Sequence, residues 1–135
     1  TKTLYEKKTL LVYDPYTWRP YCHVKDFSQI IIKIIGSDPM IFKNQIFNCG
    51  DNKNNYSKMK LVKTLKKFFP NGKIEFNYKK TKDLRNYKVN FKKLKNKLNV
   101  KIKYDIHYGI KEIINHLKRK NYKKPRDNFG NYLIK

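Results

Sequence analysis

The apolar positions of this chain fall into short periodic stretches that predict alternating strands and helices. Residues 9–13 and 20–24 are apolar runs of strand length, separated by a turn. Over residues 27–35 the apolar side chains recur at helical spacing, and Asp26 stands where an N-cap belongs. The first part of the chain therefore predicts two strands and a helix, while residues 1–8 are predicted to be the end of an earlier helix.

The same alternation continues along the second part of the chain. Ser57 and Asp105 precede apolar stripes of helical period, and each has a side chain suited to capping a helix. Apolar and polar residues alternate over residues 74–78, as in a half-buried strand. The other predicted elements are a strand at residues 45–49, an extended run at 87–89, and helices that end near residues 69, 98 and 117. These elements predict the α/β fold class, with short strands alternating with helices around a small core.

The hydrophobic pattern excludes a membrane protein. The apolar runs, such as the three isoleucines at residues 30–32, have at most four residues, far fewer than the roughly 20 residues of a membrane span. No signal-peptide pattern opens the chain. Cys22 and Cys49 lie in apolar runs and are expected to be buried free thiols, as in a reducing compartment. We therefore predict a cytoplasmic protein with no membrane partner.

The formal net charge is +23, from 33 Lys and Arg against 10 Asp and Glu. This excess first suggests a polyanionic partner. However, 29 of the basic residues are Lys and only 4 are Arg, and the residues of A/T-rich codons (Lys, Asn, Ile, Tyr and Phe) fill 77 of the 135 positions. We interpret most of the excess as compositional drift of the source genome. Nucleic acid is therefore not the expected partner, although such a surface binds polyanions non-specifically at low salt.

The sequence contains no free-standing catalytic or metal-binding motif. Its three histidines, His23, His107 and His116, are far apart, and none lies in a zinc-binding spacing. It has no Gly-rich phosphate loop and no nucleophile elbow. We predict neither a metal site nor a catalytic residue in this chain.

One segment of the chain carries a motif, and segments further along the chain match the same family pattern. Residues 18–26 read Trp-Arg-Pro-Tyr-Cys-His-Val-Lys-Asp, with an arginine before a strand and an aspartate where the strand turns into a helix. This resembles the R-x-Y/F-x-H-V-x-D segment of the extended short-chain dehydrogenase/reductases, the NAD-dependent nucleotide-sugar epimerases and dehydratases. Further segments resemble that family in the same order, at residues 46–50, 55–57, 83–89, 91–94 and 109–112. The resemblance covers roughly residues 5–120.

The resemblance implies that the chain is the C-terminal part of such an enzyme. Residues 1–120 would form the substrate-binding region and residues 121–135 a C-terminal tail. In the family an N-terminal Rossmann half binds NAD or NADP and carries a catalytic Tyr-x-x-x-Lys pair, and neither feature occurs here in a matching context. The implied partners are a nucleotide-diphosphate sugar, that Rossmann domain of the same protein, and a second subunit in a homodimer.

The resemblance also implies which residues bind the substrate. Arg19 and Arg85 match arginines that contact the substrate diphosphate in the family. A planar guanidinium meets the paired oxygens of a diphosphate bidentately, which an ammonium group cannot do. The structural alternative for each arginine is an ion pair or packing on an aromatic ring. Trp18 and Tyr21 are candidates for the nucleotide pocket, with a place in the core as the equal alternative.

Three other motif residues are expected to be structural: His23, Val24 and Asp26. Val24 is predicted to pack in the core, and Asp26 to cap the helix and fix the strand that carries Arg19. At residues 14–17 the sequence Asp-Pro-Tyr-Thr replaces the glycines usual in this turn of the family, so the contacts of that loop differ from the family pattern.

The sequence thus predicts the substrate-binding portion of an NAD-dependent nucleotide-sugar epimerase or dehydratase, which clamps the diphosphate of its substrate. Alone, the chain should be inactive. Two alternatives stay open: a small basic nucleic-acid-binding protein, and a non-catalytic remnant that binds sugar nucleotides without a Rossmann half. Lysines gathered with stacking aromatic rings on one surface would favour nucleic acid, whereas scattered lysines favour compositional drift.

Overall fold

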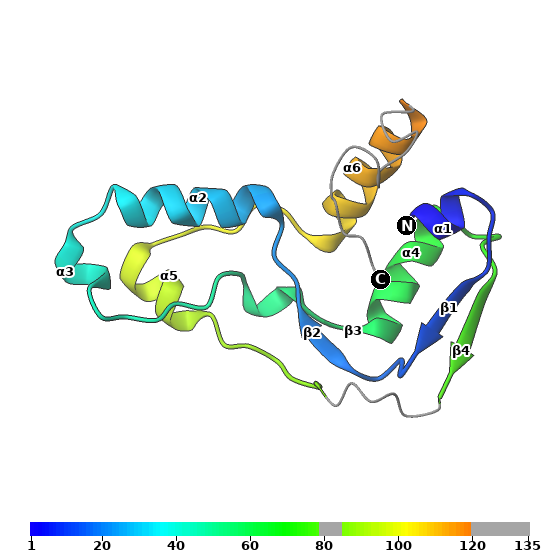
Figure 1. Ribbon diagram of the computed structural model, residues 1–135, viewed down its shortest axis with the longest axis horizontal. Helices are drawn as coiled ribbons and strands as arrows, with labels where there is room; N and C mark the ends of the chain where they lie inside the picture. Colours follow the sequence, from blue (N-terminus) through cyan, green and yellow to red (C-terminus); the bar gives the residue numbers. More distant parts are fainter. Residues whose placement is uncertain (79–84, 120–135) are drawn as a thin grey trace, which may run out of the picture.

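The computed structural model describes residues 1–78 and 85–119, and its helices and strands alternate as the sequence predicted (Figure 1). The elements are α1 (Lys2–Tyr5), β1 (Leu10–Tyr13), β2 (Trp18–Pro20), α2 (Val24–Ile35), α3 (Pro39–Phe42), the 3-10 helix η1 (Asn52–Asn54), β3 (Asn55–Ser57), α4 (Lys58–Phe68), β4 (Ile74–Asn77), α5 (Lys92–Leu98) and α6 (Ile106–Lys118). The predicted α/β class is therefore confirmed.

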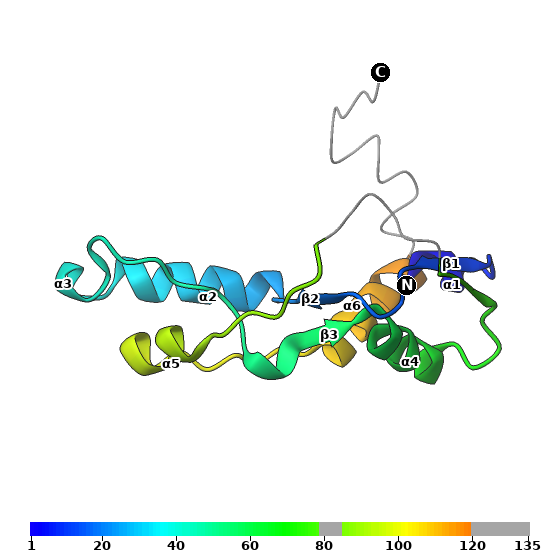
Figure 2. The same cartoon turned by 90° about the horizontal axis from the view of Figure 1, so that it is seen from below.

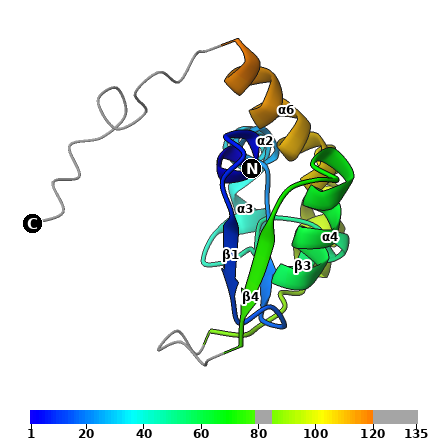
Figure 3. The same cartoon turned by 90° about the vertical axis from the view of Figure 1, so that its right-hand side faces the viewer.

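The strands form two separate two-stranded sheets. β1 and β4 are parallel, in a register that places Leu10 beside Ile74, and they run side by side in Figure 3. β2 and β3 are antiparallel, with Arg19 opposite Tyr56. Figure 1 shows β2 and β3 in the middle of an elongated molecule, between the β1–β4 sheet at one end and α2, α3 and α5 at the other. The β2–β3 pair therefore connects the two ends.

Each end of the molecule has its own small core. At the sheet end, Leu4, Leu65 and Ile110 join α1, α4 and α6, with Leu10 and Ile74 of the sheet packed against them. At the other end, Ile30 of α2 packs against two leucines of α5. Partly buried apolar side chains, most of them from neighbouring loops, pack against this group. Of the two sheets, the β1–β4 sheet packs on one of these cores, and within the described residues no strand is longer than four residues.

Helix α2 begins earlier than predicted, so the prediction that Asp26 caps it is wrong. The N-cap is His23, whose Nδ1 accepts the backbone N–H of Lys25 at 3.2 Å. Asp26 lies in the first turn and is only 2% exposed. Its two carboxylate oxygens accept the backbone N–H groups of Lys103 (3.0 Å) and Tyr104 (2.9 Å). Asp26 is thus structural, but it fixes the segment before α6 rather than the start of α2.

The apolar stripe of α2 is only partly core. Ile30 is fully buried, whereas Phe27 is 46% exposed and Ile35 is 76% exposed. Val24, predicted to pack, is 69% exposed, so that prediction is also wrong. The physical reason is that α5 covers only one side of α2 (Figure 2), and the apolar stripe is wider than a single short helix can bury.

The strand predicted at residues 45–49 does not form. No backbone amide from residue 46 to residue 49 donates a hydrogen bond to any part of the chain that the structure describes. A strand needs a neighbour that is hydrogen-bonded through the backbone, whereas among the described residues this segment is held by a side-chain bond, from Asn48 Nδ2 to the Asn90 carbonyl at 3.2 Å. Cys22 and Cys49 are free, as predicted, but only partly buried. Asp83 and the tail predicted at 121–135 lie outside the described residues.

The helix starts at Ser57 and Asp105 were predicted correctly. The Ser57 hydroxyl accepts the backbone N–H of Lys60 at 3.2 Å, and Asp105 accepts that of Tyr108 at 2.8 Å. The strand predicted at residues 20–24 lies earlier, at β2, and α3 falls in a stretch without a predicted helix. Local capping signals therefore located these two helix starts correctly. The apolar pattern located the strand less accurately.

Replacing Asp26 by Ala should lower the free energy of unfolding by about 3 kcal/mol, because two buried backbone N–H groups lose a charged acceptor. Urea unfolding near neutral pH measures the change. The control is Asp38→Ala, since Asp38 caps the four-residue helix α3 at an exposed site. That loss should be at most about 1 kcal/mol. Equal losses in the two variants would contradict the structural role given to Asp26.

Candidate anion-binding site

Strand β2 lies beside residues 85–87, a segment far from it in sequence. The backbone N–H of Trp18 donates to Asn86 Oδ1 at 2.9 Å, and the N–H of Tyr87 donates to the Trp18 carbonyl at 3.4 Å. The Arg19 guanidinium donates to the backbone carbonyl of Arg85. The structure therefore brings the side chain of Arg19 to the backbone of Arg85, the other arginine that the sequence singled out.

The side chain of Arg19 is held from two directions. Its Nη1 also donates to the Trp18 carbonyl at 2.8 Å, and its guanidinium carbon lies 5.5 Å from the centre of the Tyr87 ring. This stacking is the aromatic packing considered as the structural alternative. It is also compatible with binding, because a guanidinium stacked on a ring keeps its N–H edge for hydrogen bonds in its own plane.

A groove beside β2 gathers three lysines around the single tryptophan. The groove has a volume of about 490 Å³, and Trp18, Lys53, Lys60 and Lys88 are among the residues that line it. Lys88 Nζ lies 3.9 Å from the centre of the Trp18 ring. Within residues 1–78 and 85–119, none of these three lysines forms an ion pair with a carboxylate. The groove therefore carries uncompensated positive charge and favours an anionic ligand.

Asparagine side chains fix the backbone beneath this groove. Asn55 accepts the N–H of Val89 on its Oδ1 at 2.9 Å and donates from its Nδ2 to the carbonyl of the same residue at 3.0 Å. Asn52 Oδ1 accepts the N–H of Phe91 at 3.0 Å. Sequence reasoning found neither the lysines nor these asparagines, because Lys and Asn are so frequent here that only their positions in space distinguish them.

Tyr21, the other aromatic candidate, lies in a different place from Trp18. It lines a cleft against α6 and meets the Tyr56 ring edge-on, with the ring centres 6.3 Å apart. Burial raises the pKa of the Tyr21 hydroxyl, with the nearby Arg19 opposing that shift. Trp18 and Tyr21 therefore do not line the same pocket.

A charged cluster ties the start of α2 to α6. His23 Nδ1 accepts a backbone N–H, so the ring proton is on Nε2, which donates to Glu112 Oε2 at 3.0 Å. The other oxygen of Glu112 accepts from Lys25 Nζ at 2.5 Å. The hydrogen bond from Lys25 lowers the pKa of Glu112, and the one from His23 adds to this. His23 is therefore a positioning residue that joins two helices.

Metal ligands and membrane-spanning helices are the next features of the described residues. Among the described residues, no three His, Cys, Asp or Glu side chains are grouped so that they could hold a metal ion. In the same part of the chain, no helix has the length and apolar character needed to cross a membrane.

The chain shares its fold with part of several solved epimerase, dehydratase and dehydrogenase structures. No protein-family model and no curated protein matches the sequence. Solved structures do match, at identities low enough that they establish the fold alone.

Three of these structures illustrate the match. The dTDP-glucose 4,6-dehydratase of Bacillus anthracis in complex with NAD has a TM-score of 0.69 and 23% identity, over 92% of this chain and 39% of its own. The UDP-glucuronic acid 4-epimerase of Bacillus cereus, in complex with UDP-glucuronic acid and NAD, has a TM-score of 0.70 and 17% identity, over 88% and 38%. A GalE-like L-threonine dehydrogenase of Cupriavidus necator has a TM-score of 0.70 and 7% identity, over 86% and 43%. The chain thus spans about two fifths of the length of the structures it matches.

The stability of the chain should depend on pH through Glu112. Because the pKa of Glu112 is lower in the folded chain, its ion pairs stabilise the fold above its unfolded pKa of about 4.3, and this contribution disappears as the pH falls through the folded value. Glu112→Gln should therefore lower the urea midpoint near neutral pH and have little effect at about pH 3. The control is Glu75→Gln, at an exposed site on β4. A midpoint difference for Glu112→Gln that does not change with pH would exclude this ion pair as a source of stability.

Proposed function

We propose that this chain is the substrate-binding portion of an NAD-dependent epimerase or dehydratase, and that Arg19 and Arg85 clamp the diphosphate of a nucleotide sugar. The observation that carries the proposal is the direct contact between the Arg19 guanidinium and the backbone of Arg85. It joins β2 to a segment 66 positions away, as a two-sided clamp requires.

The surroundings of Arg19 support the clamp on energetic grounds. A mobile arginine loses rotamer freedom when it binds, which offsets part of the binding energy. Here the Tyr87 ring and the two carbonyl groups already restrict the guanidinium before any ligand arrives. The lysine groove beside β2 adds longer-range attraction, which raises the rate at which an anion finds the site.

The same proposal assigns NAD, or NADP, to a Rossmann domain of the same protein outside this chain. The matching structures have more than half of their length beyond the shared part, and two of them are NAD complexes. Such a domain would pack against the exposed apolar side of α2, formed by Phe27, Ile31 and Ile35, and against residues 46–49, whose backbone N–H groups have no partner among the described residues. We further propose that the intact enzyme is a cytoplasmic homodimer.

The clamp predicts a specific loss in the intact enzyme. Arg85→Lys and Arg19→Lys should each weaken the binding of UDP-glucose or dTDP-glucose by about tenfold, because Lys keeps the charge but loses the planar fork. The binding of NAD should not change. Calorimetric titration of wild type and variants against a panel of nucleotide sugars measures both. Arg119→Lys, at the end of α6, is the matched control and should have no effect. Unaltered nucleotide-sugar affinity in both clamp variants would refute the clamp.

One observation favours the nucleic-acid alternative as a second candidate. Lys53, Lys60 and Lys88 gather around Trp18 on one surface, the arrangement expected of a single-strand-binding groove. Against it, the face of the Trp18 ring is already covered by the Lys88 ammonium group, which would have to move before a base could stack.

The other alternative is a remnant that binds sugar nucleotides without a Rossmann half. Such a protein would bind nucleotide sugars as the clamp predicts, but the intact protein would catalyse no reaction.

Trp18, the one tryptophan of the chain, distinguishes the two candidates through its fluorescence. A nucleotide sugar should change that fluorescence saturably at about 150 mM salt, and Lys88→Gln should alter the response. A single-stranded oligonucleotide should give a response that fades with salt, with a log–log slope of about −2 for contacts by three lysines. Tight oligonucleotide binding at physiological salt, without any response to nucleotide sugars, would favour the nucleic-acid function instead.

A further inference from the structure

We infer that two asparagines, Asn55 and Asn86, are positioning residues for the clamp proposed above, on which this role depends. Their side-chain amides hold residues 85–91, the segment that begins with Arg85, in place beside β2. Within the described residues this segment belongs to no helix or strand. Side-chain hydrogen bonds therefore have to supply much of what strand pairing would otherwise supply.

Asn86 links the neighbours of both arginines. It follows Arg85 in the sequence, and its Oδ1 accepts the backbone N–H of Trp18, the residue before Arg19, at 2.9 Å. The Arg19 guanidinium itself donates to the carbonyl of Arg85. The two contacts thus lie at adjacent residues in both segments, so the bond from Asn86 fixes the backbone spacing of the two clamp residues.

Asn55 holds the same segment further along the chain, and its side-chain amide is fully engaged. The residue is 8% exposed. Its Oδ1 accepts the N–H of Val89 at 2.9 Å, and its Nδ2 donates to the carbonyls of Val89 and Asn52, both at 3.0 Å. Both amide hydrogens and the oxygen have partners, so the orientation of the amide is determined. Asn55 thereby ties the segment to the loop before β3.

The proline in β2 explains why a side chain takes this place. Trp18 directs its backbone N–H and carbonyl toward residues 85–91, and residues two apart in extended backbone face the same side. Pro20 therefore faces the segment too, but it has no N–H to donate. The amide of Asn55, which lies opposite Pro20 in the β2–β3 register, offers Val89 a donor and an acceptor instead. The segment is thus held before a ligand arrives, which lowers the cost of ordering it on binding.

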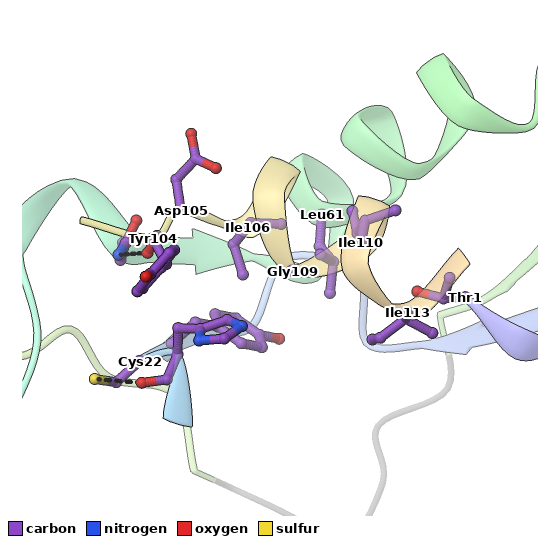
Figure 4. Close-up of a pocket in the computed structure, with 12 residues that line it drawn as sticks. Thr1, Cys22, Leu61, Tyr104, Asp105, Ile106, Gly109, Ile110 and Ile113 are labelled. Atoms are coloured by element: carbon purple, nitrogen blue, oxygen red, sulfur yellow. Dashed lines mark hydrogen bonds between the residues drawn. The ribbon is translucent and has the colours of Figure 1, made fainter. Parts of the chain in front are cut away.

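Calorimetry on the intact enzyme, with UDP-glucose and dTDP-glucose as probes, tests these roles. Asn55→Ala should weaken nucleotide-sugar binding about tenfold and Asn86→Ala about threefold, because Arg85 is then no longer held in place. NAD binding should not change. The control is Asp105→Ala, which removes the cap of α6 and should leave nucleotide-sugar affinity unchanged. Figure 4 shows Asp105 at the start of α6, beside the cleft that Tyr21 lines.

A double-mutant cycle separates positioning from a general loss of stability. Arg85→Lys should weaken binding about tenfold in wild type but at most about twofold in Asn55→Ala, because a displaced arginine contributes little. Equal factors in the two backgrounds would overturn the positioning role. Asn86 is exposed, so Asn86→Ala should fold and takes the same place in the cycle if Asn55→Ala does not fold.

The same titrations distinguish failure of the positioning role from failure of the clamp. Wild-type affinity in the asparagine variants, beside weakened binding in Arg85→Lys, would refute the positioning role and leave the clamp standing. An Arg85→Lys variant that binds both nucleotide sugars as wild type does would refute the part of Arg85 in the clamp, and the positioning role with it.

Discussion

In this chain, polar side chains give the backbone many of the hydrogen bonds that strand pairing gives it in other α/β folds. The positions of the remaining segments depend on these side-chain hydrogen bonds. Backbone N–H and C=O groups that leave water must find partners. In most α/β folds a sheet supplies those partners, but here each sheet has two short strands. The carboxylate of Asp26 therefore binds the backbone of residues 103–104, and the amide of Asn55 binds both backbone groups of Val89. These contacts position the segments that carry Arg85 and α6.

This dependence changes how the composition should be understood. Asn is one of the residues of A/T-rich codons that are abundant in this sequence. At residues 52, 54, 55 and 86, however, the Asn side chains hold loop backbone in place. A short amide offers a donor and an acceptor at a fixed separation, so it can imitate one residue of a neighbouring strand. Asn is therefore frequent along the whole sequence, and the fold uses some of these residues to hold backbone segments in place.

The sequence predicted those features whose cause is local. Ser57 and Asp105 cap helices because a side chain meets the backbone two or three residues away, and that signal is complete within the segment. Asp26 carried the same signal but binds residues 77 and 78 positions away, which no local rule anticipates. Residues 45–49 have a strand pattern without a strand, because pairing is decided by a neighbour. In the site, the motif located Arg19 and Arg85, whereas the lysine groove and the contacts of Asn55 required three-dimensional placement.

The stretch from Trp18 to His23 is where these constraints meet. Arg19 contacts the segment at residue 85, Tyr21 lines the cleft against α6, and His23 caps α2 and binds Glu112. Alternate residues of one short stretch thus serve three different neighbours, as the two-residue period of extended backbone allows. A shift of this stretch by one residue would exchange the faces and break all three contacts together. The contacts of His23 and Asp26 with the α6 side of the molecule therefore keep Arg19 in register, although neither residue belongs to the proposed clamp.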